Sequence, residues 1–132
     1  MDDFKLRPLH VTFLVLFVLC ITVWNALRAL SAIGNWDTLR EFGANPAYIF
    51  ISGLVWAVAS FWLSYRVWAR HPSAFRAGLA LSGLYFVWYW LDRLFIQSAP
   101  APNVLFSVFV SGLYLLYVII GLIASKTYLD KE

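Results

Sequence analysis

Four long apolar segments, separated by short polar stretches, are the feature that most constrains this chain. Each segment is close to the roughly 20 residues that an α-helix needs to cross the hydrocarbon core of a bilayer. Inside a bilayer every backbone amide and carbonyl needs a partner within the protein, and an α-helix supplies these partners locally. The sequence therefore predicts an all-α, polytopic membrane protein.

The composition also favours lipid as the solvent. The chain has 132 residues, of which 62% are hydrophobic and 13% are charged, whereas a typical soluble domain has about 25% charged residues. We therefore expect one transmembrane domain over residues 1–132 and no soluble domain. The net charge of +3 comes from basic residues near the segment ends, where anionic lipid headgroups attract them. Membrane lipids, and not nucleic acid, are the expected partners of these cations.

The expected transmembrane helices cover about residues 9–30, 46–68, 74–96 and 104–128. Asn45 followed by Pro46 is typical of an N-cap and the first helical position, and Ser73 is placed to cap the third helix. The prolines between Ser98 and Asn103 end that helix and lead into the fourth. Because the connections are short, neighbours in sequence are predicted to pack antiparallel in an up-down four-helix bundle.

Residues 31–44 form the longest connection, and their apolar side chains recur every three residues at Trp36, Leu39 and Phe42. This spacing predicts a short helix that lies in the headgroup region. Asp37 is a candidate cap for its start, and Gly43 a candidate for its end. An irregular loop with apolar residues against the bundle remains the alternative.

Basic residues divide unequally between the two ends of the predicted bundle. On the side of the termini lie Lys5, Arg7, Arg66, Arg70, Arg76, Lys126 and Lys131, and on the other side lie Arg28, Arg40 and Arg93. Cytoplasmic segments of membrane proteins carry the excess of Lys and Arg. We therefore expect a multi-pass protein of the cell (inner or plasma) membrane with both termini in the cytoplasm.

Small and polar residues form stripes along the predicted helices. The stripes are Thr22, Asn25 and Ala29; Gly53, Ala57, Ser60 and Ser64; Gly78, Ser82, Tyr85, Tyr89 and Asp92; and Ser107, Ser111, Tyr114, Gly121 and Ser125. In lipid, helices associate through small residues that allow close approach and through polar contacts. The stripes of the second, third and fourth helices are therefore predicted to face the interior of the bundle. The stripe of the first helix is less marked, because Trp24 and Arg28 lie on an adjoining face.

The candidate site lies where the aromatic run 84–91 ends in Asp92 and Arg93. A carboxylate in a membrane span is costly against lipid, so Asp92 should face protein. Aligning residues 23–30 with 87–94 places Arg28 at the depth of Asp92 on a helix running the same way, and we expect the two to pair. The full candidate set is Arg28, Asp92, Asn25, Tyr85, Tyr89, Arg93, Ser107 and Ser111.

Two interpretations of this set remain open. It could form an outward-facing aromatic cleft for a small cationic or amphipathic ligand, since a carboxylate and aromatic rings suit cations. Alternatively, Arg28 and Asp92 are a structural ion pair at the water boundary, inside a belt of interfacial aromatics.

Reactive residues are sparse. Cys20 is a single cysteine, and His10 and His71 lie near segment ends, so we expect no enzyme, no cofactor and no metal site. The favoured hypothesis is an accessory or interaction subunit that packs in a larger membrane assembly or with itself. A small transporter or ligand-binding protein that uses the cleft around Asp92 is the main alternative. A third is a subunit that supplies helices to a quinone or haem site completed by a partner.

Overall fold

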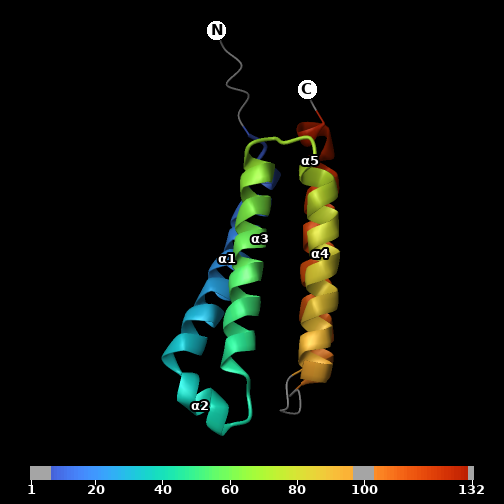
Figure 1. Ribbon diagram of the computed structural model, residues 1–132. Helices are drawn as coiled ribbons and strands as arrows, with labels where there is room; N and C mark the ends of the chain where they lie inside the picture. Colours follow the sequence, from blue (N-terminus) through green and yellow to red (C-terminus); the bar gives the residue numbers. More distant parts are fainter. Residues whose placement is uncertain (1–6, 97–102, 131–132) are drawn as a thin grey trace.

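A computed structural model describes residues 7–96 and 103–130, which are almost entirely helical (Figure 1). The helical content is 88%, and the described residues contain no strand, which confirms the all-α prediction. The elements are α1 (Leu9–Gly34), α2 (Trp36–Glu41), α3 (Pro46–Trp68), α4 (Ala74–Leu91), a π-helical turn η1 (Asp92–Ile96) and α5 (Val104–Leu129).

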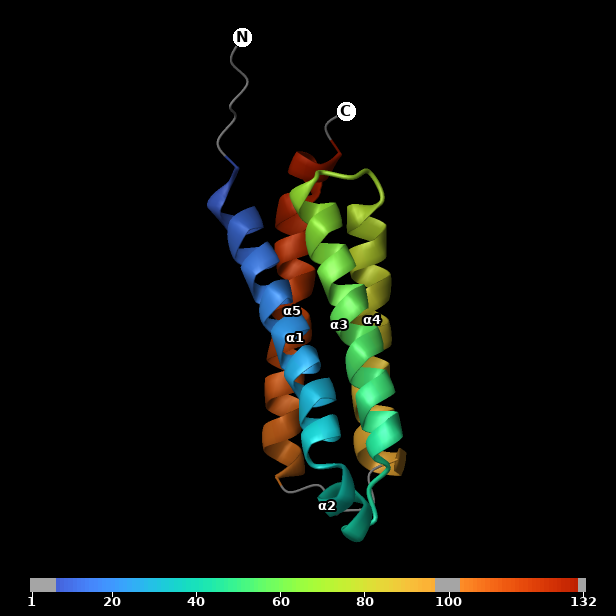
Figure 2. The ribbon, with the colours of Figure 1, turned by 60° about the vertical axis from the view of Figure 1, so that its left-hand side comes forward.

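The four long helices stand side by side, with α1 and α4 running in one direction and α3 and α5 in the other (Figures 1 and 2). The start of α1 and the end of α5 lie at the same end of the bundle, which we call the terminal end. The short helix α2 lies at the opposite end, the α2 end.

The start of α3 follows its local sequence signal. Asn45 is the N-cap, its side chain accepts a hydrogen bond from the Tyr48 amide at 3.2 Å, and Pro46 occupies the first helical position. Ser73 occupies the N-cap position of α4, as predicted, but its side chain makes no capping hydrogen bond, so the predicted capping interaction is wrong. Its hydroxyl accepts a hydrogen bond from Nη1 of Arg66 instead, at 2.7 Å.

Other boundaries differ from expectation by a few residues. α1 continues to Gly34 because no proline or capping glycine stops it at residue 30. α2 begins at Trp36, so Asp37 lies in its first turn instead of capping it, whereas Gly43 follows the helix with φ +76°, a conformation that favours glycine. The predicted turn from residue 98 to 103 lies outside the described residues except for Asn103.

Three helices of the described chain are long and apolar enough to cross a membrane: α1, α3 and α5. α4 is not among them, although it stands beside the other long helices in the bundle (Figure 2). It has 18 residues, and they include Arg76 and several Trp and Tyr side chains whose polar atoms lower its hydropathy. The structure therefore supports a multi-pass membrane protein, and whether α4 is a fourth span is taken up below.

The bundle consists of two hairpins, α1 with α3 and α4 with α5. In the first, a Cβ on Gly53 would lie only 2.8 Å from the backbone oxygen of Asn25, so the two backbones are almost in contact. In the second, Gly78 faces the side chain of Leu122. The stripes of small and polar residues are all buried or half-buried, which confirms the prediction that they face inward.

A hydrophobic core joins the two hairpins near the terminal end. Its buried residues are Val11, Leu14, Val15, Val18, Leu63, Val67, Ala74, Val118, Leu122 and Leu129. All four long helices contribute to it, so this end is held by close apolar packing. Toward the α2 end the residues between the hairpins become polar.

Candidate functional site

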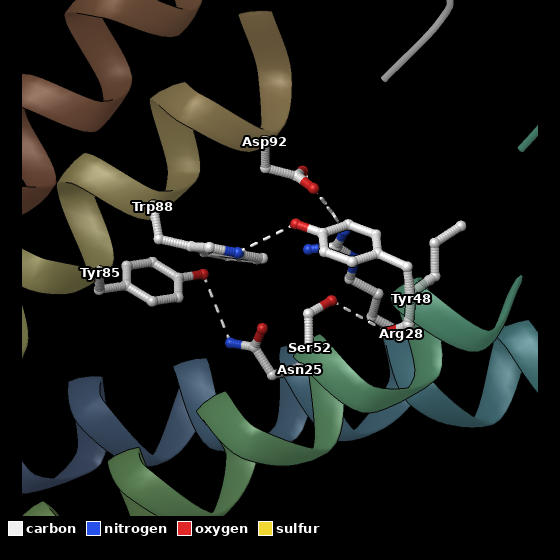
Figure 3. A network of polar contacts seen from close by, with 8 residues as sticks. Asn25, Arg28, Tyr48, Ser52, Tyr85, Trp88 and Asp92 are labelled. Atoms are coloured by element: carbon white, nitrogen blue, oxygen red, sulfur yellow. Dashed lines mark hydrogen bonds and ion pairs between the residues drawn. The ribbon is translucent and has the colours of Figure 1, made fainter. Parts of the chain in front are cut away.

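An ion pair links the two hairpins near the α2 end (Figure 3). Nη2 of Arg28 on α1 lies 3.3 Å from Oδ2 and 3.4 Å from Oδ1 of Asp92 in η1. The side chains of Arg28 and Asp92 are 21% and 4% exposed, respectively. Charge-assisted hydrogen bonds are usually about 2.7–2.9 Å long, so this pair has the length of an ion pair with loose hydrogen bonds. The structure thus brings the two residues together at one depth.

Trp88 and Tyr48 complete the surroundings of this pair. The guanidinium carbon of Arg28 lies 5.0 Å from the centroid of the Trp88 ring, within cation–π range. Nε1 of Trp88 donates to the hydroxyl of Tyr48 on α3 at 3.1 Å. That hydroxyl also lies beside the Asp92 carboxylate. Side chains from α1, α3 and α4 therefore meet around the two charges, and Asp92 is the more deeply buried of the pair.

A ladder of polar contacts continues along α1 toward the middle of the bundle. Asn25, one turn before Arg28, is fully buried, and its Nδ2 donates to the hydroxyl of Tyr85 on α4 at 3.4 Å. One turn further, the hydroxyls of Thr22 and Ser60 on α3 are 2.9 Å apart. Because residues three apart share a helix face, α1 presents three successive polar groups, each bound to a different element.

Asp92, where α4 passes into the π-helical turn η1, faces inward while its neighbours face outward. Asp92 is buried, whereas Leu91, Leu94 and Phe95 are exposed. Single π-helical turns inside α-helices occur often at functional sites. Asp92 keeps α-helical dihedral angles at the end of α4 (φ −58°, ψ −46°), so its spacing from Trp88 along the helix directs the carboxylate toward Arg28. Arg93 follows it as a half-buried residue.

Tyr89 and Ser111 lie apart from the ion pair, along a groove between α4 and α5. The groove has a volume of about 160 Å³ and is lined by Ile21, Tyr85, Phe86, Tyr89, Val110, Ser111 and Tyr114. Arg28, Asn25 and Asp92 are not among the described lining residues. The set expected to form one cleft therefore occupies two neighbouring places, and Tyr85 belongs to both.

Ser107 and Ser111 lie on α5, away from the ion pair. Ser107 is buried against the bundle, and the hydroxyl of Ser111 donates to the backbone oxygen of Val108 at 3.2 Å. Neither hydroxyl is placed at the ion pair. Within residues 7–96 and 103–130, no group of three or more His, Cys, Asp or Glu side chains lies together as a candidate metal site.

Two residues of the site, Tyr48 and Trp88, were not predicted from the sequence. Trp88 precedes Asp92 by four residues, so helical spacing alone places it on the same face and could have identified it. Tyr48 lies in the first turn of α3, and its proximity to Asp92 depends on the relative depth of two helices from different hairpins. That depth is a property of the tertiary packing.

Comparison with protein-family models found no match for this chain, and comparisons with curated proteins and with solved structures found none either.

Proposed function

We propose that the protein crosses the membrane four times, with α4 and η1 forming the third crossing in chain order. At a rise of about 1.5 Å per residue, the 18 residues of α4 extend for about 27 Å, close to the ~30 Å thickness of the hydrocarbon core. α4 packs against α3 and α5 along the bundle. Its Trp and Tyr residues near the α2 end suit the membrane interface.

In this proposal the terminal end faces the cytoplasm. Among the described residues, Arg7, Arg66, Arg70, Arg76 and Lys126 belong to that end of the bundle. The cations at the α2 end are fewer: Arg28, which pairs with Asp92, Arg40 and Arg93. The inside-positive bias therefore favours an orientation with both termini on the cytoplasmic side of the cell membrane.

The function that the geometry supports best is that of an interaction subunit, which packs against a helix of another membrane chain or of a second copy. The observation that carries this proposal is the exposure of α5. Only 17% of the most apolar stretch of α5 is buried, against 28% in α1 and in α3. Its exposed residues include Leu105, Phe106, Phe109, Leu113, Leu116, Ile120 and Ile123.

A small residue on this face would allow a partner helix to approach closely. A Cβ built on Gly112 of α5 would meet nothing within 4 Å, and small residues at exposed positions are typical of helix contacts in lipid. A transporter that uses Asp92 draws less support from the geometry. Its carboxylate is paired with Arg28 and does not belong to the described lining of the neighbouring groove.

Replacing Gly112 with Leu tests the interaction proposal. The wild-type protein, extracted in a mild detergent, is expected to form a particle heavier than one 15.1 kDa chain, and Gly112→Leu to reduce it to the single bundle. The substitution should leave the fold intact because nothing packs on Gly112. The measurement is native mass spectrometry of the solubilised particle.

Gly83→Leu is the matched control, because Gly83 on α4 also has nothing within 4 Å but lies outside the α5 face. It should leave the particle mass unchanged. A wild-type protein that is a single chain under all mild conditions would contradict the interaction proposal. So would a Gly112→Leu variant with an undiminished particle.

A further inference from the structure

The terminal end contains an open cleft that the polar ladder does not reach. It has a volume of about 610 Å³ and is lined by Pro72, Ser73, Phe75, Arg76, Lys126 and Asp130. These residues come from the start of α4 and the end of α5, which lie next to each other at the terminal end (Figure 2). The cleft is therefore formed by two helices whose relative position is already fixed by the core.

Positive charge dominates this cleft. Arg76 and Lys126 are exposed, and Asp130 is the one carboxylate among the described lining residues. A third cation, Arg66, contacts the lining of the cleft, because its Nη1 donates a 2.7 Å hydrogen bond to the hydroxyl of Ser73. The first turn of α4 adds the positive end of its helix dipole to the same wall. Among the described lining residues, an anion that enters the cleft meets two cations and one carboxylate.

Arg70, which follows α3, contacts the α5 side of the cleft. Nε and Nη2 of Arg70 donate to the backbone oxygen of Tyr128 at 3.3 and 3.2 Å. The Arg70 guanidinium lies 4.1 Å from the centroid of the Tyr128 ring. These contacts hold the last turn of α5, which carries Lys126 and ends beside Asp130, against the connection between α3 and α4. The turn that carries Lys126 is thus held in place by contacts within the protein.

An apolar surface lies next to the charges. Nζ of Lys126 lies 5.4 Å from the centroid of the Phe75 ring, so an ammonium and an aromatic face share the cleft. In the proposed membrane placement this level is the boundary between headgroups and acyl chains, where anionic lipids attract Lys and Arg. A ligand with a negatively charged phosphate and an adjoining apolar part matches both features.

We propose that this cleft binds the phosphate of an anionic phospholipid, with Arg76 and Lys126 as its phosphate ligands and Phe75 against the glycerol and upper acyl carbons. A free phosphate ester in the cytoplasm shares the same chemistry, and the experiment below separates the two. The lipid assignment rests on the proposed membrane placement, and it is independent of the proposed interaction through α5.

The test measures which lipid remains bound to the purified protein. Wild-type protein in a neutral detergent is mixed with phosphatidylglycerol or with phosphatidylcholine of the same acyl chains, and native mass spectrometry counts the retained lipid. We expect phosphatidylglycerol to be retained preferentially. Each cation removed, Arg76→Gln or Lys126→Gln, is expected to lower this retention about fivefold. Asp130→Asn removes the opposing carboxylate and is expected to raise it.

Arg40→Gln is the matched control, because Arg40 is an exposed arginine at the α2 end and should not affect retention. A loss of phosphatidylglycerol retention in Arg76→Gln, but not in Arg40→Gln, supports binding in the cleft. Equal retention of the two lipids by the wild type, or unchanged retention in the Arg76→Gln/Lys126→Gln variant, would overturn it. If the Arg76→Gln/Lys126→Gln protein fails to fold, the Asp130→Asn variant provides the test. Retention of phosphatidylglycerol by Asp130→Asn that is equal to or lower than that of the wild type would overturn the proposal.

Glycerol phosphate, added as a competitor at millimolar concentration, identifies the source of the phosphate. If it leaves bound phosphatidylglycerol in place, the acyl chains contribute to binding and the lipid assignment is supported. If it displaces the lipid completely, phosphate recognition is supported and the lipid assignment is overturned in favour of a free phosphate ester. Thermal stability of each variant, measured in the same detergent, separates these results from a failure of the membrane fold.

Discussion

Asp92→Asn is expected to lower the free energy of unfolding by about 2 kcal/mol or more, because it leaves the half-buried Arg28 guanidinium without the charge of Asp92. Breaking a buried ion pair by removing one partner typically costs ~3–5 kcal/mol. The loss expected here starts below this range because the Arg28 side chain is 21% exposed, so water can partly solvate its charge. Reversible denaturation in mixed detergent micelles measures the change, and Asp37→Asn, at an exposed position on α2, is the matched control.

A double-mutant cycle isolates the pair itself. Arg28→Gln should also destabilise, and the double variant Arg28→Gln/Asp92→Asn should be more stable than the sum of the two single losses predicts, by about 1 kcal/mol or more. Strictly additive losses would show that the charges do not stabilise each other. If Asp92→Asn left stability unchanged and abolished binding of a cationic ligand instead, the structural interpretation would give way to the ligand-binding alternative.

Gly53→Ala is expected to destabilise the protein by about 2 kcal/mol, near the middle of the ~1–3 kcal/mol range for overpacking a core. The added Cβ would lie 2.8 Å from the Asn25 backbone oxygen and 3.0 Å from the Ala29 backbone nitrogen. Backbone atoms cannot rotate away, so α1 and α3 would have to separate. Separation would also disturb the ladder, since Asn25 and Arg28 lie on the same stretch of α1. The same denaturation measurement applies.

Gly83→Ala is a close control for Gly53→Ala, because both glycines lie within the tripeptide Ser-Gly-Leu, at 52–54 and 82–84. Gly83 has nothing within 4 Å, and alanine favours a helix over glycine, so this variant should be neutral or slightly more stable. Equal losses at the two positions would mean that helix propensity, and not the close approach of α1 and α3, determines the effect.

Much of the fold can be predicted from the spacing of residue types and from helix-start residues in the sequence. Spacing alone identifies the inward stripes, because small and polar residues in lipid have few favourable places other than a helix contact. The start of α3 follows from Asn45 and Pro46. The common depth of Arg28 and Asp92 follows from counting residues along two helices that run the same way, and the structure places these side chains in contact.

The remaining features depend on packing between hairpins. Ser73 has the right position for a cap, yet Arg66 from the preceding helix takes its hydroxyl. Tyr89 lies four residues from Tyr85, but it lines the groove between α4 and α5, whereas Asp92 pairs with Arg28 of α1. Neither outcome is encoded in the spacing of residues along one helix. The first depends on how α3 and α4 meet across their short connection, and the second on how α4 packs against α1 and α5.

The most direct test of the four-span arrangement is the side of the membrane on which each end of the bundle lies. Single cysteines replace Thr38 of α2 or Asp130 after α5 in a Cys20→Ser background, and intact cells are treated with a membrane-impermeant thiol reagent. We predict that the cysteine at position 38 is labelled and that the one at position 130 is labelled only after the cells are broken. Labelling of both positions in intact cells would contradict four crossings, because α4 would then not span the bilayer.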